Sequence, residues 1–133
     1  QQGRVAGVGF GLDLTKRETQ TKLKAAGLPW ERSKAFTGSA IFSEFVTAPD
    51  TLTQLGVELR VDDVLRQKGD VSLMLYPPEV MLAELRHFLI LEDFDIVMTG
   101  TPAGVGAMRA GERFHGRVLD GERELVSGAW VAQ

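Results

Sequence analysis

The sequence predicts a β-rich α+β domain that contains two short helices. At least six short segments rich in β-branched and apolar residues are separated by turn residues, whereas only two segments have helical patterning. The strand-like and helix-like segments do not alternate regularly, which disfavours a doubly wound fold. With 133 residues, of which 44% are hydrophobic and 25% charged, the chain has the composition of one ordinary globular domain.

The N-terminal part is expected to form a strand followed by a helix. Residues 5–14 alternate apolar residues with glycines, which is typical of a strand that neighbouring backbone approaches closely, and we expect this strand to be buried. Thr15 and Glu18 have the spacing of a capping box, so a helix should follow and continue to Ala26. Gly27 is expected to end this helix.

Two hairpins are expected further along the chain. Strands are predicted wherever β-branched and aromatic residues nearly alternate, over residues 41–48, 57–61 and 64–67. The last two of these strands flank Asp62 and Asp63, which resemble the turn of a hairpin. A second hairpin is expected to turn around Asp120 and Gly121 near the C-terminus.

A second helix should begin at Pro77 and Pro78, because proline presets the backbone for the first helical turn. Its apolar residues follow at three-to-four spacing and are expected to face the core, namely Met81, Leu85, Phe88 and Leu89. Residues 95–98 should then form a strand, followed by a glycine-rich loop over residues 99–106.

Composition excludes several classes of protein. The 15 basic and 18 acidic residues are mixed along the chain, so no basic stripe is available for nucleic acid. No apolar run approaches the roughly 18 residues needed to cross a bilayer, so we do not expect a membrane protein. The absence of cysteine excludes disulfides and thiolate metal sites, and because no leader pattern opens the sequence, the expected location is cytoplasmic.

Three stretches carry the most specific patterns. The first is D-x-T-x-R-x-x-Q followed by P-W-x-x-x-K-x-F, at Asp13, Thr15, Arg17, Gln20, Pro29, Trp30, Lys34 and Phe36. The second is RQKGDVSLML over residues 66–75, and the third is TGTPAGVG over residues 99–106. In order and spacing they resemble the fumarylacetoacetate hydrolase family over nearly the whole chain. The departures are Glu18 and Val71, where the family usually has Asp and Thr.

The resemblance is closest to the short branch of acylpyruvases, oxaloacetate decarboxylases and 2-hydroxyhepta-2,4-diene-1,7-dioate isomerases. It implies the mixed β-sandwich roll of the family's C-terminal domain, with residues 1–133 as the catalytic domain. The sequence begins with Gln1 instead of Met, and Gly7 already resembles the middle of a strand, so we expect that its N-terminal part is missing.

Asp13 is the candidate metal ligand. It is expected at the end of a strand and just before a helix, where a carboxylate can reach both a hard cation and backbone N–H groups, although a lone aspartate there is commonly a turn residue. The resemblance implies that Asp13 binds Mg²⁺, with Mn²⁺ as a substitute. It places the other two ligands in a Glu-x-Glu pair upstream of this sequence, so Glu122 and Glu124 are not nominated.

Lys34 and Gln20 are the candidate catalytic residues, and Arg17 is a candidate substrate-binding residue. A lysine drawn towards a negative site can stabilise a developing enolate, although most lysines in loops are simply exposed. Arg17 and Gln20 are three residues apart on one helix face, which could hold a substrate carboxylate or could simply be solvated. The resemblance implies that Lys34 lines the metal and substrate pocket.

The glycine-rich loop supplies two more candidate substrate-binding residues, Gly100 and Thr101. Glycines let backbone N–H groups approach a ligand, and the Thr101 hydroxyl can donate a hydrogen bond. The loop lacks the Gly-Lys-Ser/Thr ending of a nucleotide-binding P-loop, so a plain glycine-rich turn is the alternative. The resemblance implies that Thr101 contacts substrate oxygens.

The activity implied by the resemblance is Mg²⁺-dependent cleavage of small 2-oxo or 2,4-dioxo acids through a metal-stabilised enolate, as acylpyruvate hydrolysis or oxaloacetate decarboxylation. Hydrolysis also needs a general base, which the family carries on an N-terminal lid outside this sequence. Isomerase or hydratase chemistry on aromatic-degradation intermediates, a non-catalytic family member or fragment, and a plain small-molecule binding module stay open. The expected partners are a small 2-oxo acid and a second copy in a homodimer.

Overall fold

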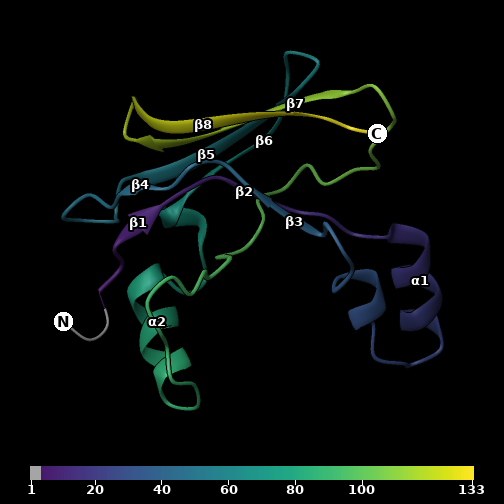
Figure 1. Ribbon diagram of the computed structural model, residues 1–133, viewed down its shortest axis with the longest axis horizontal. Helices are drawn as coiled ribbons and strands as arrows, with labels where there is room; N and C mark the ends of the chain where they lie inside the picture. The colour runs from purple at the N-terminus through teal and green to yellow at the C-terminus, as the bar shows by residue number, and fades with distance from the viewer. Residues whose placement is uncertain (1–3) are drawn as a thin grey trace. The chain divides into compact units, whose positions relative to one another are not determined.

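The computed structural model describes residues 4–133, and these form mostly strands with two α-helices, as the sequence predicts (Figure 1). The chain divides into two compact units, each described here by itself. The described residues up to Phe10 together with residues 43–133 form the sheet unit, and residues 11–42 form the 11–42 unit.

The main sheet of the sheet unit has four strands in the order β6-β5-β7-β8, and all neighbours are antiparallel. Its strands are β5 (Leu55–Val61), β6 (Val64–Asp70), β7 (Arg113–Asp120) and β8 (Arg123–Val131). Both predicted hairpins are confirmed. Asp62 and Asp63 have φ values of 47° and 64°, the left-handed backbone that a two-residue hairpin turn requires at both central positions.

The core of the sheet unit lies on one face of this sheet. Side chains alternate between the two faces of a strand, and on this face the least exposed are Leu59, Val61, Phe114 and Val118. Phe10 packs on the same face, with its ring centroid 6.1 Å from that of Trp130. A Cβ atom at Gly116 would lie 2.2 Å from the Phe10 ring, so glycine at this position makes room for it.

The single buried strand predicted over residues 5–14 is wrong in two respects. The segment forms two short strands, β1 (Gly7–Val8) and β2 (Gly11–Asp13), and Phe10 is the one residue in it that is buried. Their partners are likewise separate, because the predicted strand over residues 41–48 splits into β3 (Ala40–Phe42) and β4 (Val46–Thr47). β1 pairs with β4 in the sheet unit, and β2 pairs with β3 in the 11–42 unit.

Ser43 and Phe10 are hydrogen-bonded to each other where β1 gives way to β2 and β3 gives way to β4. The backbone N–H of Phe10 donates to Oγ of Ser43 at 2.9 Å, and the backbone N–H of Ser43 donates to the carbonyl oxygen of Phe10, also at 2.9 Å. A side-chain hydroxyl therefore replaces one ladder hydrogen bond, which explains why alternation alone did not reveal the break.

The two helices begin and end close to their predicted positions. Helix α1 (Arg17–Ala25) is followed by the short 3-10 helix η1 (Glu31–Ser33), and helix α2 (Pro78–Arg86) follows the 3-10 helix η2 (Val71–Leu73). No helix in the described part of the chain is long and apolar enough to cross a membrane.

The core face expected for α2 is wrong. No residue of α2 is buried, and the side chains of Phe88 and Leu89 just beyond it are 73% and 48% exposed. The strand expected over residues 95–98 is also absent, and Ile96, Val97 and Met98 are at least 40% exposed. An apolar pattern indicates that a segment favours burial, but it does not show which other element would cover that segment.

Candidate active site

Asp13 and Lys34 meet in the 11–42 unit. Asp13 ends strand β2, and Lys34 directly follows η1. Nζ of Lys34 lies 2.5 Å from Oδ1 of Asp13 and donates a second hydrogen bond to Oγ1 of Thr15 at 3.0 Å. The two charged side chains are 30% and 36% exposed, so the pair is accessible to small molecules.

Backbone hydrogen bonds hold the two halves of this cluster together. The N–H of Leu14 donates to the carbonyl oxygen of Ser39 at 2.8 Å, and the N–H of Lys16 donates to that of Ser33 at 3.0 Å. Ser33 is fully buried, and its hydroxyl donates to the carbonyl oxygen of Trp30 at 2.5 Å. The segment before Lys34 is therefore fixed from inside the unit.

Thr15 does not form the predicted capping box. The N-cap residue of α1 is Lys16, and no side chain caps the helix. The Thr15 hydroxyl lies 3.4 Å from the carbonyl oxygen of Asp13 and accepts the hydrogen bond from Lys34 instead. The capping prediction is wrong because the hydroxyl faces the Asp13–Lys34 pair. Thr15 is a candidate site residue that the sequence reasoning missed, although it lies between the nominated residues Asp13 and Arg17.

Arg17 and Gln20 lie on α1, where Arg17 is exposed and Gln20 is half-buried. The N–H of Gln20 donates to the carbonyl oxygen of Lys16 at 2.9 Å, which places this turn next to the cluster along the chain. Within residues 11–42, all of which the structure describes, neither side chain bonds to Asp13 or Lys34.

Gly100 and Thr101 lie in the sheet unit, in an exposed loop anchored to β6. Nε2 of Gln67 donates to the carbonyl oxygen of Pro102 at 2.9 Å. A Cβ atom at Gly104, which has a φ of 104°, would lie 2.0 Å from the carbonyl oxygen of Arg66, so the loop needs glycine to approach this strand. Gln67 is thus an anchoring residue that was noticed only as part of a motif.

The described residues offer a divalent cation one carboxylate at this site. They contain no group of three or more His, Cys, Asp or Glu side chains that could hold a metal ion. Asp13 fits a hard cation because it is partly exposed and its described ion pair uses only Oδ1. Mg²⁺ is often held by one or two carboxylates together with water and substrate. Glu124 is not free for this role, since its Oε2 lies 3.4 Å from Nη1 of Arg117.

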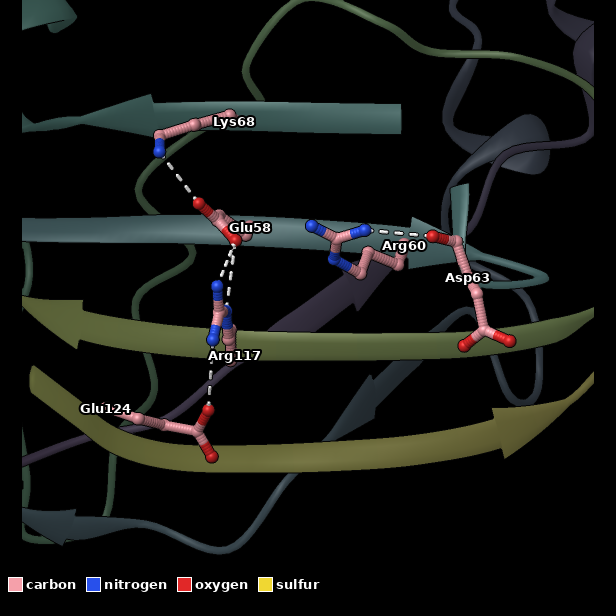
Figure 2. A network of polar contacts seen from close by, with 6 residues as sticks. All are labelled: Glu58, Arg60, Asp63, Lys68, Arg117 and Glu124. Carbon is pink, nitrogen blue, oxygen red and sulfur yellow. Dashed lines mark hydrogen bonds and ion pairs between the residues drawn. The ribbon is translucent and has the colours of Figure 1, made fainter. Parts of the chain in front are cut away.

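A second charged cluster lies in the sheet unit and has the opposite character (Figure 2). Glu58 on β5 is 5% exposed and contacts Lys68 on β6 at 2.8 Å and Arg117 on β7 at 2.6 Å. Arg117 also contacts Glu124 on β8, so the charges alternate across all four strands. The hydrogen bond from Lys68, followed by that from Arg117, lowers the pKa of Glu58 below its ordinary value.

This cluster is structural, because each charge in it already has a partner inside the sheet. The sequence reasoning missed it. The signal was a glutamate within the strand Leu55–Val61, at a position whose side chain faces away from the core.

Comparison with curated proteins finds relatives that align with most of this chain. The mitochondrial oxaloacetate tautomerase of Saccharomyces cerevisiae is 39% identical over 129 residues, which is 92% of this chain and 50% of the relative. An oxaloacetate tautomerase of Escherichia coli is 39% identical over 114 residues, covering 81% of this chain and 51% of the relative. The chain thus spans about half the length of the curated relatives it matches.

Several solved structures share the fold of this chain. A yeast fumarylacetoacetate hydrolase family protein aligns with a TM-score of 0.89 and 34% identity, over 97% of this chain and 55% of the other. Fumarylpyruvate hydrolase from Pseudomonas aeruginosa, in complex with Mn²⁺ and pyruvate, aligns with a TM-score of 0.81 and 35% identity, over 97% of this chain and 55% of the other.

The sequence model of the fumarylacetoacetate hydrolase C-terminal domain matches residues 2–127, which is nearly the whole chain. This match includes the segment from Asp13 to Lys34 and the loop that contains Thr101. The resemblance inferred from the motifs is therefore confirmed, and the chain belongs to the fumarylacetoacetate hydrolase family.

Proposed function

We propose that this protein catalyses enol–keto chemistry on small 2-oxo acids, with oxaloacetate tautomerisation as the first candidate reaction. One observation carries the proposal: Nζ of Lys34 is held by Oδ1 of Asp13 and Oγ1 of Thr15 in a partly exposed position. The names of the relatives support the choice of reaction, because the two reported at 39% identity are oxaloacetate tautomerases.

The chemistry needs a cation at a defined point. Tautomerisation moves one proton from C3 of the oxo acid to the oxygen on C2, and negative charge develops on that oxygen during the transfer. A fixed ammonium stabilises such charge without having to reorient. In this proposal Lys34 supplies the ammonium, while Asp13 and Thr15 hold it in place through the two contacts described above.

We propose that Asp13 also binds a divalent cation, Mg²⁺ or Mn²⁺. The support is its partly exposed carboxylate, together with the Mn²⁺ complex of the fumarylpyruvate hydrolase that shares this fold. When bound, such a cation supplies Lewis-acid polarisation of the 2-oxo carbonyl group. Asp13 would hold it, while the same carboxylate and Thr15 keep Lys34 in place.

The remaining nominated residues keep their roles as proposals. Gln20 is proposed as a second catalytic residue, because it lies half-buried on the first turns of α1, directly after the cluster. Arg17, Gly100 and Thr101 are proposed to bind substrate. The anchored loop around Pro102 supports a defined position for Thr101 within the sheet unit.

Cleavage of a carbon–carbon bond is the second candidate reaction. Hydrolysis of a 2,4-dioxo acid such as an acylpyruvate, or decarboxylation of oxaloacetate, also leaves an enolate at C2 and C3 of the oxo acid. The fumarylpyruvate hydrolase with 35% identity favours keeping hydrolysis. Hydrolysis requires a general base to activate water, whereas tautomerisation requires a group that carries the proton between C3 and the oxygen on C2.

We also propose that the chain forms a homodimer. Exposed apolar side chains gather between residues 73 and 98, and surfaces of this kind often mark protein–protein interfaces. A strictly monomeric mass in light scattering would contradict the dimer. The cytoplasmic location expected from the sequence stays a prediction.

The first test is decay of the oxaloacetate enol, followed by its ultraviolet absorbance, with Mg²⁺, with Mn²⁺ and with a chelator. We expect metal-dependent acceleration by the wild type and a loss of about hundredfold in Asp13→Asn, since Lewis-acid polarisation is worth several kcal/mol. Asp50→Asn is the control, because Asp50 is an exposed aspartate in the sheet unit. Equal rates for Asp13→Asn and wild type would falsify the metal assignment.

A further inference from the structure

We propose that Lys16 binds a second carboxylate on the substrate, so that the site favours dicarboxylic over monocarboxylic 2-oxo acids. This inference rests on the proposed function, because it concerns the same site. It starts from a charge asymmetry in the chain. Residues 11–42 contain six basic and three acidic residues, whereas the rest of the chain contains nine basic and fifteen acidic residues. The unit that carries the site is therefore locally positive and attracts anions.

The cations of this unit differ in whether their charge is compensated. The ammonium of Lys34 is paired with Asp13, which is the one ion pair within residues 11–42. Lys16 has no carboxylate partner among the described residues, and its Nζ lies 4.5 Å from the centroid of the Phe36 ring. An aromatic ring orients an ammonium but does not neutralise it. Lys16 is therefore held in place with its charge available.

Lys16 contacts the segment around Lys34 through both its backbone and its side chain. Its backbone N–H donates to the carbonyl oxygen of Ser33, the residue before Lys34. Its side chain reaches the ring of Phe36, two residues after Lys34, and two residues of chain span at most about 7 Å. Thr15, its preceding neighbour, accepts the hydrogen bond from Lys34. The ammonium of Lys16 thus lies over a ring that belongs to the same short segment as Lys34.

This placement separates two kinds of substrate. A monocarboxylic 2-oxo acid would use its carboxylate and oxo group at Lys34 and the proposed cation, and it has no further charge. A dicarboxylic acid such as oxaloacetate offers a second carboxylate, which Lys16 can pair with. Lys16 is partly in solvent, so we expect a preference of about fivefold, the upper range for an exposed ion pair.

The kinetic test compares oxaloacetate with its 4-methyl ester, which keeps the 2-oxo acid and removes the second charge. Lys16→Gln should raise KM for oxaloacetate about fivefold and leave kcat unchanged, while KM for the ester stays within about twofold. Lys24→Gln is the matched control, because Nζ of Lys24 lies in the same way over the Trp30 ring, at 4.4 Å from its centroid. Lys24 is eight residues, or about 12 Å, further along the helix.

A binding test separates this inference from the proposed function. Backbone amide shifts of Thr15 and Lys16 are followed by NMR during titration with succinate and with monomethyl succinate. The wild type should bind succinate about fivefold more tightly, and the difference should vanish in Lys16→Gln but persist in Lys24→Gln. Added salt should reduce it, since an exposed pair is screened.

The outcomes are distinct. Absence of turnover with every 2-oxo acid, with the succinate preference present and dependent on Lys16, would overturn the proposed function and retain the anion site. Equal affinity of the wild type for succinate and its ester, or equal changes in the Lys16 and Lys24 variants, would overturn the role of Lys16.

Discussion

Glu58 and Asp13 are ion-paired carboxylates in different units of this protein, and they differ in burial and in the number of their partners. Glu58 in the sheet unit is 5% exposed and is bonded to both Lys68 and Arg117. Asp13 in the 11–42 unit has a side chain that is 36% exposed and pairs with Lys34 alone. Both carboxylate oxygens of Glu58 have partners within the sheet, whereas the ion pair of Asp13 leaves Oδ2 available to a ligand.

The comparison teaches how to separate a structural ion pair from a candidate active site. Burying a charge is costly unless partners satisfy it, so a buried and fully paired carboxylate contributes to folding and is closed to ligands. A partly exposed pair contributes little to stability but can exchange a partner for a substrate or cation. The two clusters should therefore respond to mutation in opposite ways.

The largest effect is expected for Lys34→Met on activity. Loss of a group that stabilises developing negative charge should lower kcat for oxaloacetate tautomerisation by about hundredfold or more. The free energy of unfolding in urea should change by less than about 1 kcal/mol, because the Asp13–Lys34 pair is partly exposed. Lys22→Met, a change at an exposed lysine of α1, is the control and should leave both quantities unchanged. Unchanged kcat in Lys34→Met would remove this lysine from the chemistry.

The next largest effect is expected for Glu58→Ala on stability. Removal of the carboxylate leaves Arg117 and Lys68 without their shared partner, and we expect a loss of about 2 kcal/mol in the free energy of unfolding. This value lies below the range for a fully buried pair because both cationic side chains reach solvent. Glu122→Ala in the exposed β7–β8 turn should change stability by less than about 0.5 kcal/mol. Equal losses in the two variants would contradict the structural role of Glu58.

The pH dependence of stability should distinguish the same two carboxylates. The pKa of Glu58 is lowered in the folded state, first by Lys68 and then by Arg117. Its stabilising contribution is therefore fully present above the ordinary glutamate pKa of about 4.3 and is lost as pH falls through the lower folded value. Urea unfolding of wild type and Glu58→Gln should differ most near neutral pH and converge in acid. A difference that grows as pH falls would have the wrong sign.

The smallest effect is expected for Glu124→Gln at the end of the network. The pKa of Glu124 is lowered mainly by its hydrogen bond with Ser127 and less by that with Arg117. Its side chain is 42% exposed, so the change should cost no more than about 0.5 kcal/mol in thermal or urea unfolding. A loss as large as that of Glu58→Ala would show that the network acts as a unit, with Glu124 essential to it.

Much of the fold could be predicted because it depends on local patterns. Asp62 and Asp63 indicate a two-residue turn, and Pro77 and Pro78 indicate the start of a helix. Both signals are independent of contacts with the rest of the chain. Contacts between segments that are far apart in the sequence could not be predicted in this way. The apolar side chains after α2 and those of residues 96–98 have the pattern of buried residues but stay exposed in the described chain.

The same division holds for the candidate site. Motif spacing nominated Asp13 and Lys34, and the structure places their side chains in contact. Thr15 was assigned to helix capping because the spacing to Glu18 fits that role equally well, and only the direction of the hydroxyl separates the two roles. Glu58 escaped notice because its partners come from strands that are distant in sequence, and no single-strand pattern reveals them.

The reciprocal bonds between Phe10 and Ser43 have a consequence for modularity. These two residues flank the 11–42 unit in sequence, and their backbones lie within hydrogen-bonding distance of each other. Chain segments whose ends meet in this manner tolerate insertion and removal well. The segment that carries Asp13, Lys16 and Lys34 therefore begins and ends at neighbouring points. It could be replaced by a short turn or by the matching segment of a relative, without cutting any connection of the four-stranded sheet.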